Sequence, residues 1–246
     1  GIDLSVGFVM GLAAVVMEPF RSELPRDGFV EKVAARCRAA GAVFIVDEVT
    51  AGWRFGFPGG CSKLGIAPDI AVYAKAMSNG IPCAAVVGEE AVMDAANASF
   101  ISSSYWTDGI GPAAALACIR KMRRTGTQAY VESLGDQLRA MLSELRTKHA
   151  ALHLTIGNRP CAPSITFALG AAALPAKALM IRKMLARGFL MSSQLYVMQA
   201  HEESHLRSMT EALDEVLTEL GVLHGAGRLA EEAGPVVPGG GFTRLA

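Results

Sequence analysis

A lysine and an aspartate each follow a short apolar segment of this sequence. Asp47 comes directly after residues 42–46, and Lys75 comes directly after residues 70–74. Both segments are rich in β-branched residues and too short for helices, so we expect two buried parallel strands. Because open α/β sheets bind ligands at the carboxyl ends of their strands, both side chains are expected at a ligand site.

The chemistry available to this pair is that of pyridoxal phosphate. A lysine amine forms a Schiff base with the cofactor aldehyde, and a carboxylate keeps the pyridine nitrogen protonated so that the ring acts as an electron sink. Once released, Lys75 could move a proton at the substrate carbon. An isolated lysine at a strand end is more often solvated, and an isolated aspartate more often caps a turn. The small neighbours Ala74 and Ala76 and the turn at Gly80 favour the functional interpretation.

Three further residues could complete the site. Val49 lies two positions after Asp47 and could press on the cofactor ring, although a core valine is the alternative. Thr107 precedes a predicted helix, whose N–H groups and dipole attract a phosphate; an N-cap with turn glycines is the alternative. Glu18, with Glu23 nearby, follows a predicted strand and is either a carboxylate of the site or a solvated loop residue.

Composition limits the class of protein. The 246 residues are 51% hydrophobic and 19% charged, which favours a folded domain with a sizeable core. Lys plus Arg and Asp plus Glu number 23 each, which argues against nucleic acid or a membrane surface as a partner. The longest mostly apolar segment, residues 6–17, is too short to span a bilayer and lacks the basic start of a secretory signal. Widely spaced cysteines without a CxxC pair favour a cytoplasmic location over a disulfide framework or structural zinc.

The elements that must position the site alternate between strand and helix over the first part of the chain. This order indicates a mostly parallel sheet with right-handed crossovers. A Gly-rich loop over 53–65 is expected on the surface near the site. The expected strands are 12–17, 42–46, 70–73 and 83–87, and the expected helices are 29–40, 89–98, 112–124 and 128–148.

Composition changes near Ala150, where we expect a domain boundary, with an α+β domain behind it. Its predicted strands are 152–156 and 164–168, and its predicted helices are 177–187 and 202–220, with the tail from Gly225 loosely ordered. His201 and His205 are four residues apart and could form a metal pair on one helical face. A solvated helix start is the favoured interpretation of the two histidines.

Four segments together resemble the class III aminotransferases, a family of pyridoxal-phosphate enzymes of fold type I. They are MEPFRSE (17–23), VFIVDEVTAGWR (43–54), PDIAVYAKAMSNGIP (68–82) and SYWTDGIGPAAALA (104–117). Within the family the chain is similar to the glutamate-1-semialdehyde 2,1-aminomutase branch. The resemblance implies part of the large α/β domain, with a mostly parallel sheet, at 1–150 and the small C-terminal α+β domain at 151–246.

The resemblance also implies a role for each candidate residue. Asp47 would bind the pyridine nitrogen, Val49 would pack on the ring, and Lys75 would form the Schiff base. Thr107 would reach the phosphate of the neighbouring subunit's cofactor, which implies a homodimer with a shared active site. The expected activity is amino-group transfer, or 1,2-migration of an amine, on a small aldehyde or keto substrate.

Two departures from the family pattern bear on this expectation. No segment matches the amino-terminal half, which carries the phosphate turn and the groups that select the substrate, so the chain resembles the carboxyl-terminal part of a longer enzyme. Residues 192–196 lack the arginine that transaminases of this class use for the 2-oxoglutarate carboxylate, as in the aminomutase branch. The alternative function is therefore an inactive fragment, or a half-subunit that needs an amino-terminal partner.

Overall fold

The computed structural model describes residues 14–20, 25–105, 107–159 and 161–236. The chain divides into two compact units, Gly1–Glu132 and Ser133–Ala246. The division falls inside the long helix α5 (Thr127–Lys148), whereas composition placed the boundary near Ala150, just beyond the end of the same helix. The assignment of these units to the large and small domains of the family stays a prediction.

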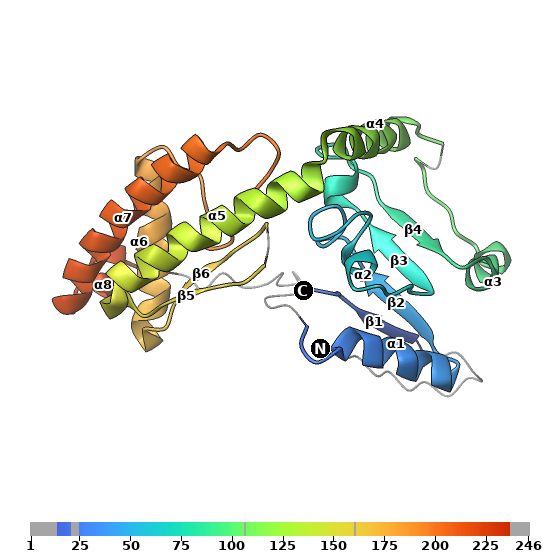
Figure 1. The fold of residues 1–246 in the computed structure, drawn as a ribbon, viewed down its shortest axis with the longest axis horizontal. Helices are drawn as coiled ribbons and strands as arrows, with labels where there is room; N and C mark the ends of the chain where they lie inside the picture. Colours follow the sequence, from blue (N-terminus) through green and yellow to red (C-terminus); the bar gives the residue numbers. More distant parts are fainter. Residues whose placement is uncertain (1–13, 21–24, 106, 160, 237–246) are drawn as a thin grey trace. The chain divides into compact units, whose positions relative to one another are not determined.

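A four-stranded sheet in the order β1-β2-β3-β4 forms the centre of the first unit (Figure 1). Strands β1 (Ala14–Met17), β2 (Val43–Asp47) and β3 (Ile70–Tyr73) are parallel, and β4 (Ala85–Gly88) is antiparallel to β3. The mostly parallel sheet that the sequence predicts is confirmed, with its last strand antiparallel. The connection to this strand holds only a 3₁₀ turn, η1 (Lys75–Met77), and a connection without a crossover helix returns the chain antiparallel.

Helix α1 (Phe29–Ala40) has the bounds that the sequence predicts, and it packs on one face of the sheet. Its buried residues Val30, Ala34 and Cys37 form a core with Phe44 and Val46 of β2. Since side chains alternate along a strand, the half-buried Asp47 lies on the opposite face of β2 from this core. The sheet thus turns the aspartate away from the packing face.

The prediction of a surface loop over residues 53–65 is wrong. Trp53, Phe55 and Cys61 are buried, and a short helix, α2 (Gly60–Lys63), lies within the segment. The glycines permit close packing here: a Cβ atom on Gly59 would lie 2.5 Å from the Glu48 carboxyl carbon. The glycines of this segment therefore allow close packing in the protein interior. From sequence alone, such glycines cannot be distinguished from glycines in an exposed loop.

The remainder of the first unit follows β4 in the chain, and one of its helices contacts the turn after β3. The chain runs through α3 (Glu90–Met93), η2 (Asp94–Ala98) and α4 (Ile110–Thr125) before α5 begins. The Cys118 thiol of α4 donates to the Ala76 carbonyl of η1, with 3.5 Å between sulfur and oxygen. Helix α4 thereby supports the turn that begins at Lys75.

The second unit joins a two-stranded antiparallel sheet, β5 (Leu154–Ile156) and β6 (Ile165–Phe167), to a group of helices. Its 3₁₀ helices are η3 (Ala150–Leu152) and η4 (Gly170–Ala172), and its α-helices after α5 are α6 (Ala173–Ala186), α7 (Glu203–Gly225) and α8 (Leu229–Ala233). Fully buried leucine and methionine side chains of α6 and α7 form the core. Each of the described helices is too short or too polar to span a lipid bilayer.

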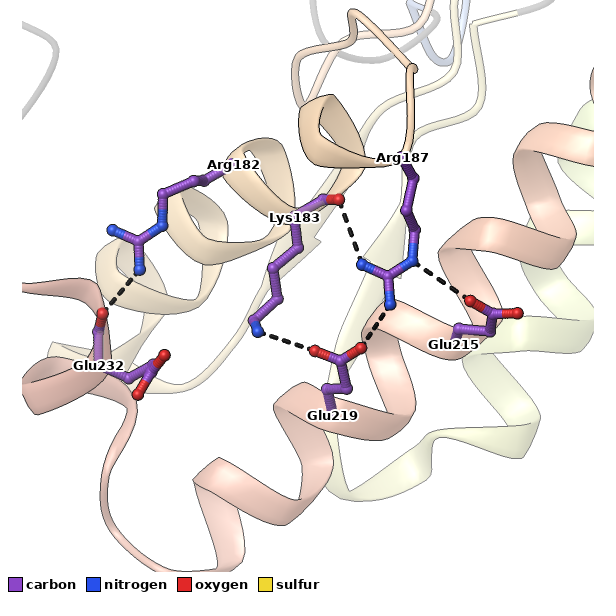
Figure 2. A network of polar contacts seen from close by, with 6 residues as sticks. All are labelled: Arg182, Lys183, Arg187, Glu215, Glu219 and Glu232. Atoms are coloured by element: carbon purple, nitrogen blue, oxygen red, sulfur yellow. Dashed lines mark hydrogen bonds and ion pairs between the residues drawn. The ribbon is translucent and has the colours of Figure 1, made fainter.

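The expectation of a loosely ordered tail is wrong for Leu229–Ala233, which form α8. Both end residues of this helix are buried. The Arg182 guanidinium of α6 donates to the carbonyls of Glu232 at 2.7 Å and Ala233 at 3.2 Å, as Figure 2 shows for Glu232. Carbonyls at a helix end lack partners within the helix, so this contact stabilises α8 against α6.

Ion pairs join the carboxyl end of α6 to α7 (Figure 2). Lys183 pairs with Glu219 at 2.8 Å, and Arg187 pairs with Glu215 at 3.2 Å and also with Glu219. The hydrogen bond from Lys183, and then that from Arg187, lower the pKa of the Glu219 carboxyl against the opposing effect of burial. The charges of this network are thus matched within the protein.

Candidate active site

The register of β2 and β3 brings Asp47 and Lys75 to the same edge of the sheet. Asp47 lies opposite Val72 in the parallel pair, and Lys75 follows the end of β3 by one intervening residue, Ala74. Neighbouring strands lie about 4.8 Å apart, and three residues of strand advance about 10 Å. Both residues therefore occupy the carboxyl end of the parallel strands, on neighbouring segments.

Asp47 uses one carboxylate oxygen for the local fold and keeps the other available. Its Oδ1 accepts a hydrogen bond from the Val49 N–H at 2.8 Å, which closes the turn after β2. Its Oδ2 accepts no hydrogen bond from the residues that the structure describes. The turn-capping interpretation of Asp47 is correct for one oxygen, and the second oxygen of this half-buried side chain remains open to a ligand.

Lys75 is exposed and has an unusual backbone conformation. Its φ of +48° lies in the left-handed region, which a residue with a Cβ atom adopts at a cost of about 1–2 kcal/mol. Its carbonyl accepts hydrogen bonds from the N–H groups of Ser78 and Asn79. Its Nζ donates to the Thr50 Oγ1 at 2.9 Å. Strained residues of this kind concentrate at functional sites, since only surrounding structure can maintain them.

Glu48 is a fully buried carboxylate that sequence reasoning did not single out. It accepts hydrogen bonds from the N–H groups of Gly60 and Cys61, both at 2.8 Å. Burial, followed by the nearby Glu48 charge, raises the pKa of Cys61 to about 12 and that of Tyr73 to about 12. Through its two hydrogen bonds, Glu48 attaches the segment around α2 to the end of β2, directly beside Asp47.

An aromatic contact packs the segment that follows β2 against β3. The rings of Trp53 and Tyr73 lie 4.9 Å apart between centroids, tilted by 51°. Gly52 lies beneath them, where a Cβ atom would lie 2.8 Å from the Glu48 carbonyl oxygen and 2.9 Å from the Tyr73 ring. The segment around Gly52 and Trp53 is therefore tightly packed against β3.

The remaining candidates lie at different places. Val49 is half-buried in the turn after β2, and Glu18 is half-buried directly after β1, while Glu23 lies outside the described residues. Thr107 is exposed, and its hydroxyl makes no hydrogen bond to the described part of the chain. At the start of α4 the Asp108 carboxylate accepts from the Ile110 N–H at 2.9 Å, so Asp108 makes the hydrogen bond that the N-cap interpretation gave to Thr107.

Residues 10–156 match the family model described as aminotransferase class III. The chain belongs to this family. It is 34% identical over 166 residues to aminopentol aminotransferase of Sphingopyxis macrogoltabida, a match that covers 64% of this chain and 38% of that protein. It is also 33% identical over 153 residues to a glutamate-1-semialdehyde 2,1-aminomutase of an Anaeromyxobacter species, covering 59% and 34%. Relatives named as aminotransferases and as aminomutases both match, so the predicted family is confirmed.

Solved structures confirm the predicted fold of this class III aminotransferase chain. The FumI protein of Sphingopyxis sp. MTA144, solved in its PLP internal aldimine form, superposes with a TM-score of 0.78 at 26% identity, covering 87% of this chain and 53% of that one. An omega-transaminase from Sphaerobacter thermophilus has a TM-score of 0.74 at 22% identity, covering 83% and 51%. The matched part of the chain thus spans about a third of the length of these curated relatives and about half of the length of these solved chains.

Asp47 and Lys75, at the sheet edge of this class III aminotransferase chain, offer the two kinds of group that pyridoxal phosphate needs. The family uses this cofactor, as predicted, and needs an acceptor for a pyridine N–H and an amine for an aldehyde. The Asp47 Oδ2 is an acceptor without a partner among the described residues. The Lys75 amine meets only a hydroxyl there, so it too is available to react.

The second unit contains a separate cavity of about 700 Å³, lined mainly by apolar side chains together with His201 and His205. The two rings lie 6.5 Å apart between centroids, and each Nδ1 accepts a backbone N–H near the start of α7. Burial, followed by the neighbouring His205, lowers the pKa of His201. The described residues include no group of three or more histidine, cysteine or acidic side chains placed to hold a metal ion.

Proposed function

We propose that this chain carries the cofactor-attachment site of a pyridoxal-phosphate-dependent class III enzyme, which transfers an amino group or moves it within one aldehyde or keto substrate. The observation that carries this proposal is the placement of Asp47 and Lys75 on neighbouring parallel segments at one sheet edge. Membership in the family supports it. The substrate would be a small molecule.

Each residue of the site would have a separate task. Pyridoxal phosphate, when bound, withdraws electrons from the carbon that carries the amino group and so makes its C–H bond acidic. Asp47 would accept the pyridine N–H through Oδ2 while the Val49 N–H holds Oδ1 in place. Val49 would pack on the ring, and Lys75 would attach the cofactor and then carry the proton at the substrate carbon.

The proposal extends to a homodimer in the cytoplasm with residues shared between subunits. Thr107 is exposed and has no internal hydrogen bond among the described residues, so its hydroxyl is available to the phosphate of a cofactor bound mainly by the partner chain. Glu18, beyond β1, is the candidate on the substrate side. In this arrangement residues 1–150 belong to the large domain and residues 151–246 to the small domain.

Cofactor attachment can be tested on the 246-residue chain. We expect the chain mixed with pyridoxal phosphate to show the absorbance of a lysine-bound form, and borohydride reduction to fix the cofactor on the peptide that contains Lys75. Lys75→Ala should abolish both signals. Lys32→Ala, which removes an exposed lysine of α1, is the matched control and should behave as wild type. Equal attachment to wild type and Lys75→Ala would contradict the proposal.

The second candidate function is a half-subunit that is inactive alone. The observation that favours it is the coverage of the solved relatives, 53% for the FumI chain. Transamination should be measured first with the 246-residue chain and then with an added amino-terminal half taken from a related enzyme. Turnover by the chain alone would exclude this candidate, and turnover that requires the added half would establish it.

A further inference from the structure

We propose that Thr50 is a positioning residue for Lys75, holding the amine in the orientation from which it attacks the cofactor aldehyde. The contact that points to it is the hydrogen bond from the Lys75 Nζ to the Thr50 Oγ1, 2.9 Å long. This inference rests on the proposed function, since it concerns the same lysine. It assigns a role to a residue for which neither composition nor spacing gave one.

Thr50 can serve this purpose because its own position is fixed. Its carbonyl accepts from the Arg54 guanidinium at 2.9 Å. The next three residues of the chain are buried, and the Gly52 N–H donates to the Glu48 carbonyl at 2.7 Å. The buried Glu48 carboxylate attaches the same segment to α2. The hydroxyl of Thr50 therefore extends from a rigid turn, as a positioning group must.

The backbone of Lys75 is also fixed. The hydrogen bonds that its carbonyl accepts from Ser78 and Asn79 keep the backbone in the left-handed conformation. Helix α4 supports the following turn through the bond from Cys118 to Ala76. A long exposed lysine side chain ordinarily samples many rotamers, so a defined backbone alone does not direct the amine. The bond to Thr50 supplies the second point of attachment.

The chemistry explains why orientation matters. Attachment joins Nζ to the aldehyde carbon and releases the carbonyl oxygen as water, together with the two hydrogens of the neutral amine. While one N–H points at the Thr50 Oγ1, the lone pair is directed elsewhere and can face the carbonyl carbon. Holding a nucleophile in a reactive geometry raises the rate of its reaction. Thr50 accordingly acts before attachment and takes no part in bond making itself.

The test compares Thr50→Val, which keeps the shape but removes the hydroxyl, with Thr50→Ser, which keeps the hydroxyl. The rate of pyridoxal-phosphate attachment to the 246-residue chain is followed by borohydride trapping and peptide mass spectrometry. We expect Thr50→Val to attach the cofactor about fivefold more slowly than wild type, the effect of losing about one hydrogen bond, and Thr50→Ser to remain within about twofold. Equal rates for Thr50→Val and wild type, or equally slow rates for both variants, would overturn the inference.

A second measurement works without cofactor and separates this inference from the proposed function. In protein labelled with ¹³C at the lysine ε-carbon, NMR relaxation should show restricted motion of Lys75 in wild type and Thr50→Ser, and greater motion in Thr50→Val. Lys75→Arg identifies the signal. If wild type attaches no cofactor at Lys75, the proposed function fails while this result still decides the role of Thr50. Unchanged relaxation in Thr50→Val would overturn that role.

Discussion

The sheet edge of the first unit and the helix network of the second unit use charge in opposite ways. In the network, Lys183 of α6 and Arg187, which directly follows α6, are matched by Glu215 and Glu219 of α7 (Figure 2). At the sheet edge, one Asp47 oxygen has no partner among the described residues, and the charge on Lys75 meets only a hydroxyl. Charges matched within the protein stabilise it, whereas charges left open at a sheet edge are suited to a ligand.

A second comparison lies within the sheet edge itself. Asp47, the last residue of β2, and Glu48, which follows it, are consecutive acidic residues in different environments. Glu48 is 0% exposed and accepts two backbone N–H groups, so its charge serves the fold. Asp47 is half-buried and accepts a hydrogen bond from one backbone N–H group. The variants below test whether these two acidic residues differ as their environments indicate.

The largest effect is expected from Glu48→Ala. Removing this carboxylate leaves the Gly60 and Cys61 N–H groups without an acceptor in a buried place, so the free energy of unfolding should fall by about 3 kcal/mol. Asp47→Ala is the matched control and should lower it by less than about 1 kcal/mol, because water can reach the half-buried turn. Urea denaturation measures both. Similar losses for the two variants would remove the distinction between the neighbouring carboxylates.

The next largest effect is expected for cofactor affinity in Asp47→Asn. A neutral amide no longer offers a charged acceptor to the pyridine N–H, and we expect affinity for pyridoxal phosphate to fall by about thirtyfold, or about 2 kcal/mol. Stability should change little. Fluorescence titration of the 246-residue chain measures the affinity.

Asp69→Asn is the control for this titration. Asp69 lies at the amino end of β3, where its Oδ2 accepts from the Phe44 N–H at 2.7 Å. Because ligands bind at the carboxyl ends of parallel strands, the Asp69 substitution should leave cofactor affinity unchanged even if it lowers stability. A loss of affinity of the same size in both variants would show that Asp47 acts through the fold and not through the cofactor.

A smaller effect concerns the backbone of Lys75. Since its φ of +48° strains any residue with a Cβ atom, Lys75→Gly should be more stable than Lys75→Ala by about 1 kcal/mol. In an ordinary extended or helical position the order would be reversed, because glycine loses more entropy on folding. Thermal unfolding of the two variants gives the comparison. A more stable alanine variant would mean that the left-handed conformation is not maintained in solution.

The elements that could be predicted from the sequence are those with a local cause. Helix α1 and strand β3 match their expected bounds because their apolar spacing and flanking residues suffice to define them. The direction of β4 could not be predicted, since it depends on how the chain returns after η1. The burial of Gly59 could not be predicted either. A glycine that packs against a buried carboxylate cannot be distinguished in sequence from a glycine in a surface loop.

The site shows the same limit. Asp47 and Lys75 could be found from their positions after apolar segments. Glu48 and Thr50 lie within three residues of Asp47, but their tasks depend on partners distant in sequence: Gly60 and Cys61 for Glu48, and Lys75 for Thr50. Long-range contacts of single polar atoms leave no periodic pattern, so only the fold reveals them.

The smallest effect is expected in the helix network, where it depends on pH. Hydrogen bonds from Lys183, and then from Arg187, hold the pKa of the Glu219 carboxyl below its ordinary value of 4.5. A lowered pKa in the folded state means that the stabilisation is present above pH 4.5 and is lost as the pH falls through the folded-state pKa. Because the side chain is 41% exposed, screening by water limits the contribution to about 0.5 kcal/mol.

Glu219→Gln should therefore be less stable than wild type at pH 7 by about 0.5 kcal/mol, and the difference should shrink steadily as the pH falls below about 4.5. Urea denaturation across this range measures it. Glu211→Gln, on the same helix but outside the network, is the control and should show a smaller difference at pH 7. If the Glu219 difference persisted in acid, the contact would act through packing or hydrogen bonding that does not need the charge. The contrast with the open carboxylate at the sheet edge would then lose its electrostatic basis.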